Sequence, residues 1–249
     1  MSEGSAKALV YSAVGACVGL FLFLRSFRTF KEAKLIANTP TSKIRSLAMG
    51  RVEVYGKVEL NTSETLIAPF SGKRCAYCRW TIEEYRSSGK SSHWVTVRKG
   101  TEGRYFYVND GTGRVLVDYH GARVDIPSDE RSRKLSPQAK RFMTDIKYNY
   151  KSFIFNKSLR ITEWRLDAND KLYIMGTAGD NPFIEDGTST KNEGDIMIQK
   201  KGSAFFYMSD RPEKEILKSF RWKSYGGLLG GAALTLVCLG IIFGVLGIL

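Results

Sequence analysis

The sequence predicts a mainly β protein of the α+β class, in which a small barrel-like or sandwich-like soluble domain lies between two transmembrane helices. Two observations predict the helices, because residues 8–24 and residues 226–249 contain no charged side chain. A third predicts the β domain, because apolar residues recur with a period of two in several short segments between them. We therefore divide the chain into a first span at residues 8–24, a soluble domain at residues 39–220 and a second span at residues 226–249.

The second apolar segment is long enough to cross a membrane. Its 24 residues, at about 1.5 Å per helical residue, exceed a hydrocarbon core of about 30 Å. The alternative is a buried core helix, but a soluble helix of this length would show a polar face. We therefore expect a membrane span.

The first apolar segment is shorter and follows Lys7. Its 17 residues stand at the short end of the spanning range, and the alternative is a cleaved signal peptide. No clear small-x-small cleavage site lies past Leu24, and four basic residues follow the segment. We therefore expect a retained membrane helix that continues out of the bilayer as far as residue 38.

Basic residues beside both segments indicate how the chain is oriented. The formal net charge is +13. Four Lys or Arg follow the first span and four precede the second, namely Arg25, Arg28, Lys31, Lys34, Lys214, Lys218, Arg221 and Lys223. Such residues concentrate on the cytoplasmic side, so we expect an integral membrane protein with two spans and a cytoplasmic soluble domain. Besides the bilayer itself, the same cations would attract anionic lipids.

The first part of the soluble domain predicts short strands. In residues 51–60 the apolar side chains alternate with Arg51, Glu53, Lys57 and Glu59, which is typical of a half-buried strand. Residues 76–83 alternate in the same way, with Ala76, Cys78, Trp80 and Ile82 on one face. Further strands are expected at residues 93–98, 104–108, 114–118 and 124–126, and Asp110-Gly111 is typical of a tight hairpin turn.

The second part predicts one helix and further strands. A loop is expected at residues 128–135, and then a helix with Ser136 as its N-cap and Pro137 as its first residue. Strands are expected at residues 158–166 and 171–175, followed by a polar loop at residues 179–194. A last hairpin is expected from residues 195–199 and 204–208, before a helix that runs into the second span.

Four blocks of the domain resemble a known family. They are TPTSKIRSLAMGRVEVYGKVE at residues 39–59, FSGKRCAYCRWTIEEY at 70–85, FYVNDGTGRVLVDYHGARV at 106–124 and EWRLDANDKLYIMGTA at 163–178. Together they resemble the GIDE domain, also called "beside a membrane", of the MULAN-type mitochondrial E3 ubiquitin ligases. The resemblance covers roughly residues 39–220 and includes the two flanking spans.

The resemblance implies an E3 ubiquitin ligase, in which a RING finger follows the second span. A RING finger needs eight Cys or His ligands, whereas this sequence has four Cys and two His. Two of the four cysteines, Cys17 and Cys238, lie in the predicted spans. We therefore expect no RING finger in this chain, and the ligase activity does not follow from the domain alone.

The pair Cys75-x-x-Cys78 is a candidate redox or zinc site. Side chains three apart in a regular strand point to opposite faces, so we expect Cys78 in the core and no shared site, unless the chain turns at Cys75. His93 and His120 are expected in surface or hairpin positions. The sequence therefore predicts no metal and no cofactor.

Two other patterns are weaker candidates for chemistry. Glu83 and Glu84 are neighbours on a strand and face apart, so general acid–base catalysis by the pair is not expected. Residues 110–113 (DGTG) lack the following helix that a phosphate loop needs. Consequently, no catalytic residue can be named, and whether the chain is an enzyme stays open.

Two sets of residues are candidates for binding. Strand alternation predicts that Arg79, Tyr85, Trp94 and Arg98 are exposed, where they could bind a protein partner or an anionic lipid. In the spans, Gly15-x-x-x-Gly19 could pack against Gly226-x-x-x-Gly230, residues 227 and 231, or Gly240-x-x-x-Gly244. These glycines predict that the spans pack together or drive homo-oligomerisation.

These observations favour a membrane-anchored, non-catalytic interaction module with an unknown protein partner. The first alternative is a component of a ubiquitin or ubiquitin-like ligase system, with the RING finger supplied by another chain. A hydrolase is not favoured, because no catalytic constellation is present. A nucleic-acid-binding barrel is not favoured either, because a small barrel would interleave basic and aromatic residues in any case.

Overall fold

The computed structural model describes residues 3–62, 65–89, 91–150, 158–184 and 193–247. Half of the predicted polar loop at residues 179–194, namely residues 185–192, lies outside the described residues, as do the last two residues of the second span. The chain divides into two units, which we describe separately. One contains residues 1–39 and 212–249, and the other contains residues 40–211.

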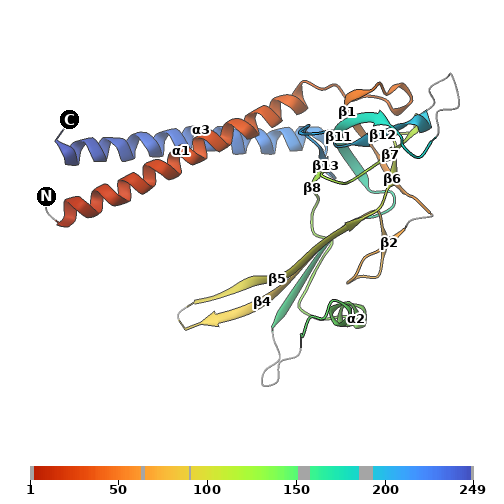
Figure 1. Ribbon diagram of the computed structural model, residues 1–249, viewed down its shortest axis with the longest axis horizontal. Helices are drawn as coiled ribbons and strands as arrows, with labels where there is room; N and C mark the ends of the chain where they lie inside the picture. Colours follow the sequence, from red (N-terminus) through yellow and green to blue (C-terminus); the bar gives the residue numbers. More distant parts are fainter. Residues whose placement is uncertain (1–2, 63–64, 90, 151–157, 185–192, 248–249) are drawn as a thin grey trace. The chain divides into compact units, whose positions relative to one another are not determined.

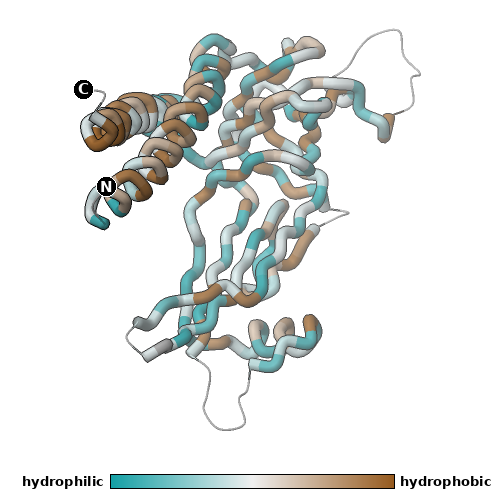
Figure 2. The backbone as a smooth tube through the Cα atoms, turned by 60° about the vertical axis from the view of Figure 1, so that its left-hand side comes forward, coloured by the Kyte–Doolittle hydropathy of each residue, from teal (hydrophilic) through white to brown (hydrophobic). Residues whose placement is uncertain are grey.

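The first unit is a pair of long helices. Helix α1 (Glu3–Ala37) has 35 residues and α3 (Glu213–Leu246) has 34. In each helix only 11% of the most apolar 18-residue window is buried, whereas the core helix of a soluble protein would be mostly buried. Figure 2 shows the long hydrophobic stretch in each helix. Both helices are long and apolar enough to cross a membrane, as the sequence predicts.

Small residues bring the two helices into contact. A Cβ built on Gly19 would lie 2.9 Å from the carbonyl oxygen of Gly231, and one built on Gly227 would overlap Ser26. At these positions the neighbouring helix leaves no room for a larger side chain. Gly15 faces Cys238, Gly19 faces Gly231 and Thr235, and Gly227 faces Ser26.

The other predicted glycines take no part in this helix contact. Gly226, Gly230, Gly240 and Gly244 have open space where a Cβ would stand. They lie on a different face of α3, because residues 226 and 227 differ by about 100° around a helix. Whether this open face mediates self-association stays a prediction.

The second unit contains a closed five-stranded ring. Its strands are β1 (Gly50–Leu60), β6 (Phe106–Asn109), β7 (Arg114–Val117), β12 (Ile196–Gln199) and β11 (Lys171–Asp180). Each pairs with the next, and β11 pairs with β1 to close the ring. Two short strands, β13 (Tyr207–Ser209) and β8 (Arg123–Asp125), extend the sheet from β11. The predicted barrel is therefore confirmed.

The alternating residues of β1 explain why the ring closes on an apolar core. Val52, Val54 and Val58 are buried with Phe106, Val108 and residues from the other strands. The short helical turn η1 (Ile44–Ser46) adds Ile44 to the same core. The backbone amide of Ile44 donates to Asp110 Oδ2 at 3.1 Å, which joins this turn to the β6–β7 hairpin.

One predicted surface position of β1 is wrong. Glu53 is fully buried, although alternation assigns it to the polar face. Its carboxylate accepts hydrogen bonds from Tyr173 Oη at 2.6 Å and Thr41 Oγ1 at 2.7 Å. A buried carboxylate needs such partners, and they come from segments that the local pattern does not report.

A second layer is built from a four-stranded sheet and a helix. The strand order is β5 (Ser91–Gly103), β4 (Tyr77–Ser88), β10 (Leu159–Leu166) and β9 (Glu130–Ser132). Helix α2 (Pro137–Asp145) lies beside this sheet (Figure 1). Ser136 caps it by accepting a hydrogen bond from the amide of Ala139 at 3.1 Å. A small pair, β2 (Leu66–Ile67) and β3 (Arg74–Cys75), completes the layer.

Three predicted elements differ from the structure. The expected loop at residues 128–135 contains β9, which pairs with β10 through Glu163 and its neighbours. The expected last hairpin is wrong, because β12 pairs with β7 and β11 while β13 pairs with β8 and β11. Ala76 lies between β3 and β4 and belongs to the barrel core, so it does not share a face with Cys78.

The element η2 (Glu193–Asp195) precedes β12.

Candidate interaction surface

The two faces of the four-stranded sheet have different chemistry. On β4, Cys78, Trp80 and Ile82 are buried against α2 and the β2–β3 pair. Side chains alternate along a strand, so Arg79, Glu83 and their neighbours of the same parity lie on the opposite face.

Cross-strand partners share a face, and the register therefore identifies the residues beside Arg79 and Glu83. Arg79 is opposite Trp164, Glu83 is opposite Arg160, and Tyr85 is opposite Trp94. We name this surface the basic–aromatic face, and it consists of Arg79, Glu83, Tyr85, Trp94, Lys99, Arg131, Arg133, Arg160 and Trp164.

Trp94, on the edge strand β5, makes several of the aromatic contacts of this face. The guanidinium of Arg160 lies 4.4 Å from the centre of its ring, and that of Arg133 lies 5.3 Å away. The Tyr85 ring packs beside it at 5.2 Å. The negative faces of the indole ring attract both guanidinium groups. The stacking therefore helps to hold Arg160 and Arg133 on this face.

A bidentate ion pair fixes Arg160. Its Nε and one Nη donate to the two carboxylate oxygens of Glu83, at 2.7 and 2.9 Å. These hydrogen bonds lower the pKa of Glu83, and the charge of Arg131 adds to the effect. Glu83 is thus ionised at neutral pH and orients Arg160 under Trp94.

Arg79 makes a second stacked pair further along the sheet. Its guanidinium lies 4.4 Å from the ring centre of Trp164. The Nε atom is buried and has no hydrogen-bond partner among the residues that the structure describes. Stacking on the ring therefore accounts for much of how this cation is held.

The charge on the face is strongly unbalanced. It carries five cations, on residues 79, 99, 131, 133 and 160, against the single carboxylate of Glu83. Lys99, Arg131 and Arg133 are exposed. Such a surface attracts acidic groups, and the aromatic rings offer apolar contact area beside the charges.

Three of the four predicted interaction residues meet on this face, and Arg98 does not. The pairing of β4 with β5 shifts between Ile82 and Glu83, so that Val97 is an extra residue on β5. A bulge of one residue reverses the alternation. Arg98 therefore lies on the α2 side, with its guanidinium 5.8 Å from the ring of Tyr148.

A buried ion pair lies on the opposite face, beneath the same sheet. Glu163 and Arg165 have side chains 1% and 5% exposed, and their Oε1 and Nη1 atoms are 2.8 Å apart. The second oxygen of Glu163 accepts from the backbone amides of Phe70 and Ser71, and Arg165 also pairs with Asp167 and Asp129. Sequence alternation cannot reveal this network, because its partners are distant in the chain.

The two cysteines of the Cys75-x-x-Cys78 motif share the same buried cluster. The expected opposition of their side chains is wrong, because β3 ends at Cys75 and β4 begins at Tyr77. Both thiols are fully buried. A hydrogen bond between them raises the pKa of the Cys78 thiol, and burial raises it further. The Cys78 thiol is thus protonated, and both cysteines belong to the core.

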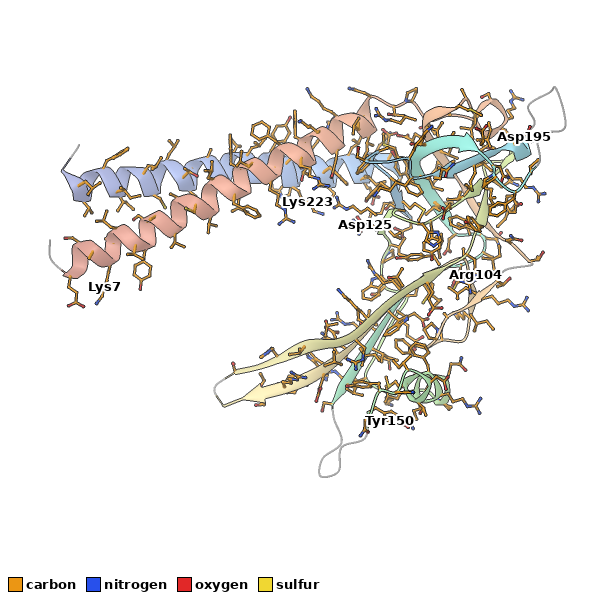
Figure 3. The ribbon with its side chains drawn as sticks, viewed as in Figure 1. Lys7, Arg104, Asp125, Tyr150, Asp195 and Lys223 are labelled. Atoms are coloured by element: carbon orange, nitrogen blue, oxygen red, sulfur yellow. The ribbon has the colours of Figure 1, made fainter. Side chains whose placement is uncertain are left out.

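The histidines lie apart from this cluster. His93 is exposed on β5, and the ring of His120 stacks on Tyr119 with ring centres 4.2 Å apart and contacts Asp118. Across the residues that the structure describes, no group of three or more His, Cys, Asp or Glu could hold a metal ion. Figure 3 draws the side chains of the four-stranded sheet and labels Tyr150 near α2.

Comparison with known proteins assigns the family. The family model for GIDE, described as an E3 ubiquitin ligase, matches residues 79–246. The chain belongs to the GIDE family. The match begins on β4, includes most of the barrel and the four-stranded sheet, and ends with α3. Neither the curated proteins nor the solved structures gave a match.

In this GIDE-family chain, the basic–aromatic face is a candidate interaction surface. The paired carboxylates considered above separate as predicted: Glu83 pairs with Arg160 on the basic–aromatic face, whereas Glu84 lies 3.4 Å from Arg86. The DGTG segment is a hairpin turn in which Asp110 accepts hydrogen bonds from Thr112.

Proposed function

We propose that this GIDE-family chain is a membrane-anchored, non-catalytic interaction module whose basic–aromatic face binds an acidic segment of a protein partner. The single observation behind the proposal is the surplus of cations around Trp94. Arg160 and Arg133 both stack on that ring, and only Glu83 offsets the charges of the face.

The preorganisation of the face supports a protein ligand. Stacking and the Glu83–Arg160 pair fix two guanidinium groups before any ligand arrives, which reduces the entropy lost on binding. Arg groups fixed in this way suit carboxylates, because the guanidinium fork can bind them through two hydrogen bonds. Tyr85 and Trp94 add the aromatic area that is typical of binding hot spots.

The test uses the full chain in detergent and a fluorescent polyglutamate peptide as probe. The variant Lys99→Gln/Arg131→Gln/Arg133→Gln removes three exposed cations and leaves the Glu83–Arg160 pair intact. We expect roughly tenfold weaker binding, since an exposed ion pair contributes about 0.5 kcal/mol. Fluorescence anisotropy measures the affinity.

The matched control removes three exposed cations elsewhere, in Lys73→Gln/Lys140→Gln/Arg141→Gln. These positions lie before β3 and on α2. The control should bind the probe as the unaltered chain does. Equal losses in both triple variants would mean that only net charge matters, and the proposed site would then be wrong.

A second candidate function has support from the family. Because the GIDE family model is described as an E3 ubiquitin ligase, the chain is also a candidate component of a ubiquitin or ubiquitin-like ligase system that works with a RING finger on another chain. Native co-purification after crosslinking tests this, with a photoreactive residue placed at exposed Thr96. Recovery of a RING-bearing or E2-like protein would support this function. If no such protein is among the crosslinked products, the result contradicts it.

For the orientation of the chain we propose a cytoplasmic soluble domain. The supporting observation is that basic residues flank the inner ends of both apolar stretches, at residues 25–34 and 214–223. Protease added to the cytoplasmic side of sealed membranes should digest the domain. Protection of the domain until the membrane is permeabilised would reverse the proposed orientation.

A further inference from the structure

The part of α3 that precedes its apolar stretch has a hollow on one face. The hollow has a volume of about 410 Å³ and is lined by Lys214, Leu217, Lys218, Arg221, Trp222 and Tyr225. These residues recur every three or four positions, so a single helix face supplies all of them. Three cations and two aromatic rings therefore surround one shallow groove.

The composition of this groove is unusual for a surface in water. Trp222 is 82% exposed and Tyr225 is 52% exposed. Lys214, Lys218 and Arg221 are exposed, and they form no ion pair with other residues in the described part of the chain. Large aromatic rings beside Lys and Arg, at the end of an apolar helix, are typical of the membrane–water interface.

The same helix face continues as an apolar stripe. Leu229 follows Tyr225 by four positions and Leu236 follows Leu229 by seven, and these leucines are 72% and 69% exposed. Steps of four and seven residues keep side chains on one face. One face of α3 thus presents cations first, then aromatic rings, then exposed leucines.

This order matches the order of groups in a phospholipid. Along the helix, Arg221 lies about 6 Å above Tyr225 and Lys218 about 10 Å above it, at 1.5 Å per residue. The polar region of one leaflet is about 5–8 Å thick, and a Lys side chain can extend along the helix to reach it. Lys218 and Arg221 are therefore within reach of the phosphate level when Tyr225 lies at the edge of the hydrocarbon.

The neighbouring helix fixes the aromatic end of the groove. The rings of Phe30 and Tyr225 contact each other edge to face, with centres 6.2 Å apart, and the Lys34 ammonium lies 5.0 Å from the centre of the Phe30 ring. Both helices belong to the same unit. Tyr225 thus contacts α1, while the side chains of Lys214, Lys218 and Arg221 are exposed. Figure 3 labels Lys223 in this stretch of α3.

We propose that this face of α3 binds an anionic phospholipid. Lys218 and Arg221 bind the phosphate, Lys214 contacts the outer part of the headgroup, and Trp222 and Tyr225 lie at the level of the glycerol. An acyl chain lies along Leu229 and Leu236. The apolar continuation of the groove favours a lipid over a free phosphate ion, which would use only the cations.

The test reports on Trp222, which is the only tryptophan in α1 or α3. The full chain is reconstituted in phosphatidylcholine vesicles that contain either brominated phosphatidylglycerol or brominated phosphatidylcholine at the same mole fraction. Bromine quenches nearby tryptophan, so we expect more quenching by the anionic lipid. The excess should vanish in Trp222→Phe, whose remaining tryptophans all lie in the soluble domain.

A matched pair of variants locates the site. Lys218→Gln/Arg221→Gln should lower the enrichment of the anionic lipid by about fivefold for each cation removed. The control, Arg25→Gln/Arg28→Gln, removes the same charge from α1 and should keep the excess quenching. Because these residues are exposed, neither pair should disturb the contact between the helices.

Three results would overturn the proposal. The first is equal quenching by the two brominated lipids in the unaltered chain. The second is an equal loss in the α1 control, which would mean that the cations act only as a diffuse charge. The third is reversal of the excess quenching by inorganic phosphate at constant ionic strength, because the site would then bind phosphate instead of the lipid. The polyglutamate experiment on the basic–aromatic face is independent of all three.

Discussion

Charged residues of the four-stranded sheet have opposite roles on its two faces. Arg133 and Arg131 are exposed, and they are available to a ligand. Glu163 and Arg165 are buried and satisfy each other, with backbone amides and Asp167 completing their hydrogen bonds. We therefore expect Arg131 and Arg133 to contribute to ligand binding, and Glu163 and Arg165 to contribute to the stability of the fold.

Removing one member of the buried pair should destabilise the protein. Glu163→Ala leaves the Arg165 charge buried and removes the acceptor for the Phe70 amide, so we expect a loss of about 3–5 kcal/mol in the free energy of unfolding. Thermal unfolding of the full chain in detergent, followed by near-ultraviolet circular dichroism, measures the change.

The control for this variant is Glu102→Ala, at an exposed position of β5. It should change the stability by no more than about 0.5 kcal/mol. If Glu163→Ala and Glu102→Ala have the same small effect, the buried pair does not stabilise the sheet.

At the level of single residues, sequence patterns predict which side chains are exposed better than they predict which residues those side chains contact. Alternation correctly assigns Arg79, Tyr85 and Trp94 to one face, because period two is a local property of a strand. It fails at Glu53, whose partners Tyr173 and Thr41 come from other segments. Arg98 is exposed as predicted, but it lies on the α2 side of the sheet, since a bulge depends on how two strands pair.

At the level of elements, the apolar helices and most strands follow from periodicity. The N-cap at Ser136 and the hairpin turn at Asp110 are also local signals, and the structure confirms both. The barrel's closure is not local, because β11 pairs with β1 across more than 100 residues. Local pattern also predicts that β12 and β13 form a hairpin, because they are neighbours in the sequence. Instead, both strands pair with β11.

The contact between α1 and α3 gives a prediction that uses a native cysteine. A Cβ built on Gly15 lies 3.9 Å from the Cβ of Cys238, which is close to the separation of a disulfide. In a Cys17→Ser background, Gly15→Cys should form a disulfide with Cys238 on mild oxidation. After proteolysis in the soluble domain, a non-reducing gel should show the two helices still linked.

Two neighbouring glycines provide the controls for this crosslink. Gly231→Leu should prevent it, because the added side chain meets the backbone of Gly19 and Phe23. Gly230→Leu should leave it intact, since nothing occupies the space beside Gly230. A crosslink that survives in both variants, or disappears in both, would contradict this packing.

At the scale of the whole molecule, the chain joins a β-rich domain to a pair of apolar helices. The GIDE match continues from the sheet into α3 as far as residue 246, so the family includes this helix with the domain. A domain tethered at both ends stays close to the membrane surface, where local concentration favours partners that are on the same membrane.

Alkaline carbonate extraction of native membranes tests the tether most directly. Peripheral proteins are released by this treatment, whereas proteins whose helices lie in the hydrocarbon stay with the lipid. We predict that the full chain remains in the membrane pellet, because transferring the exposed apolar side chains of α1 and α3 into water is unfavourable. Recovery of the chain in the supernatant would contradict the account.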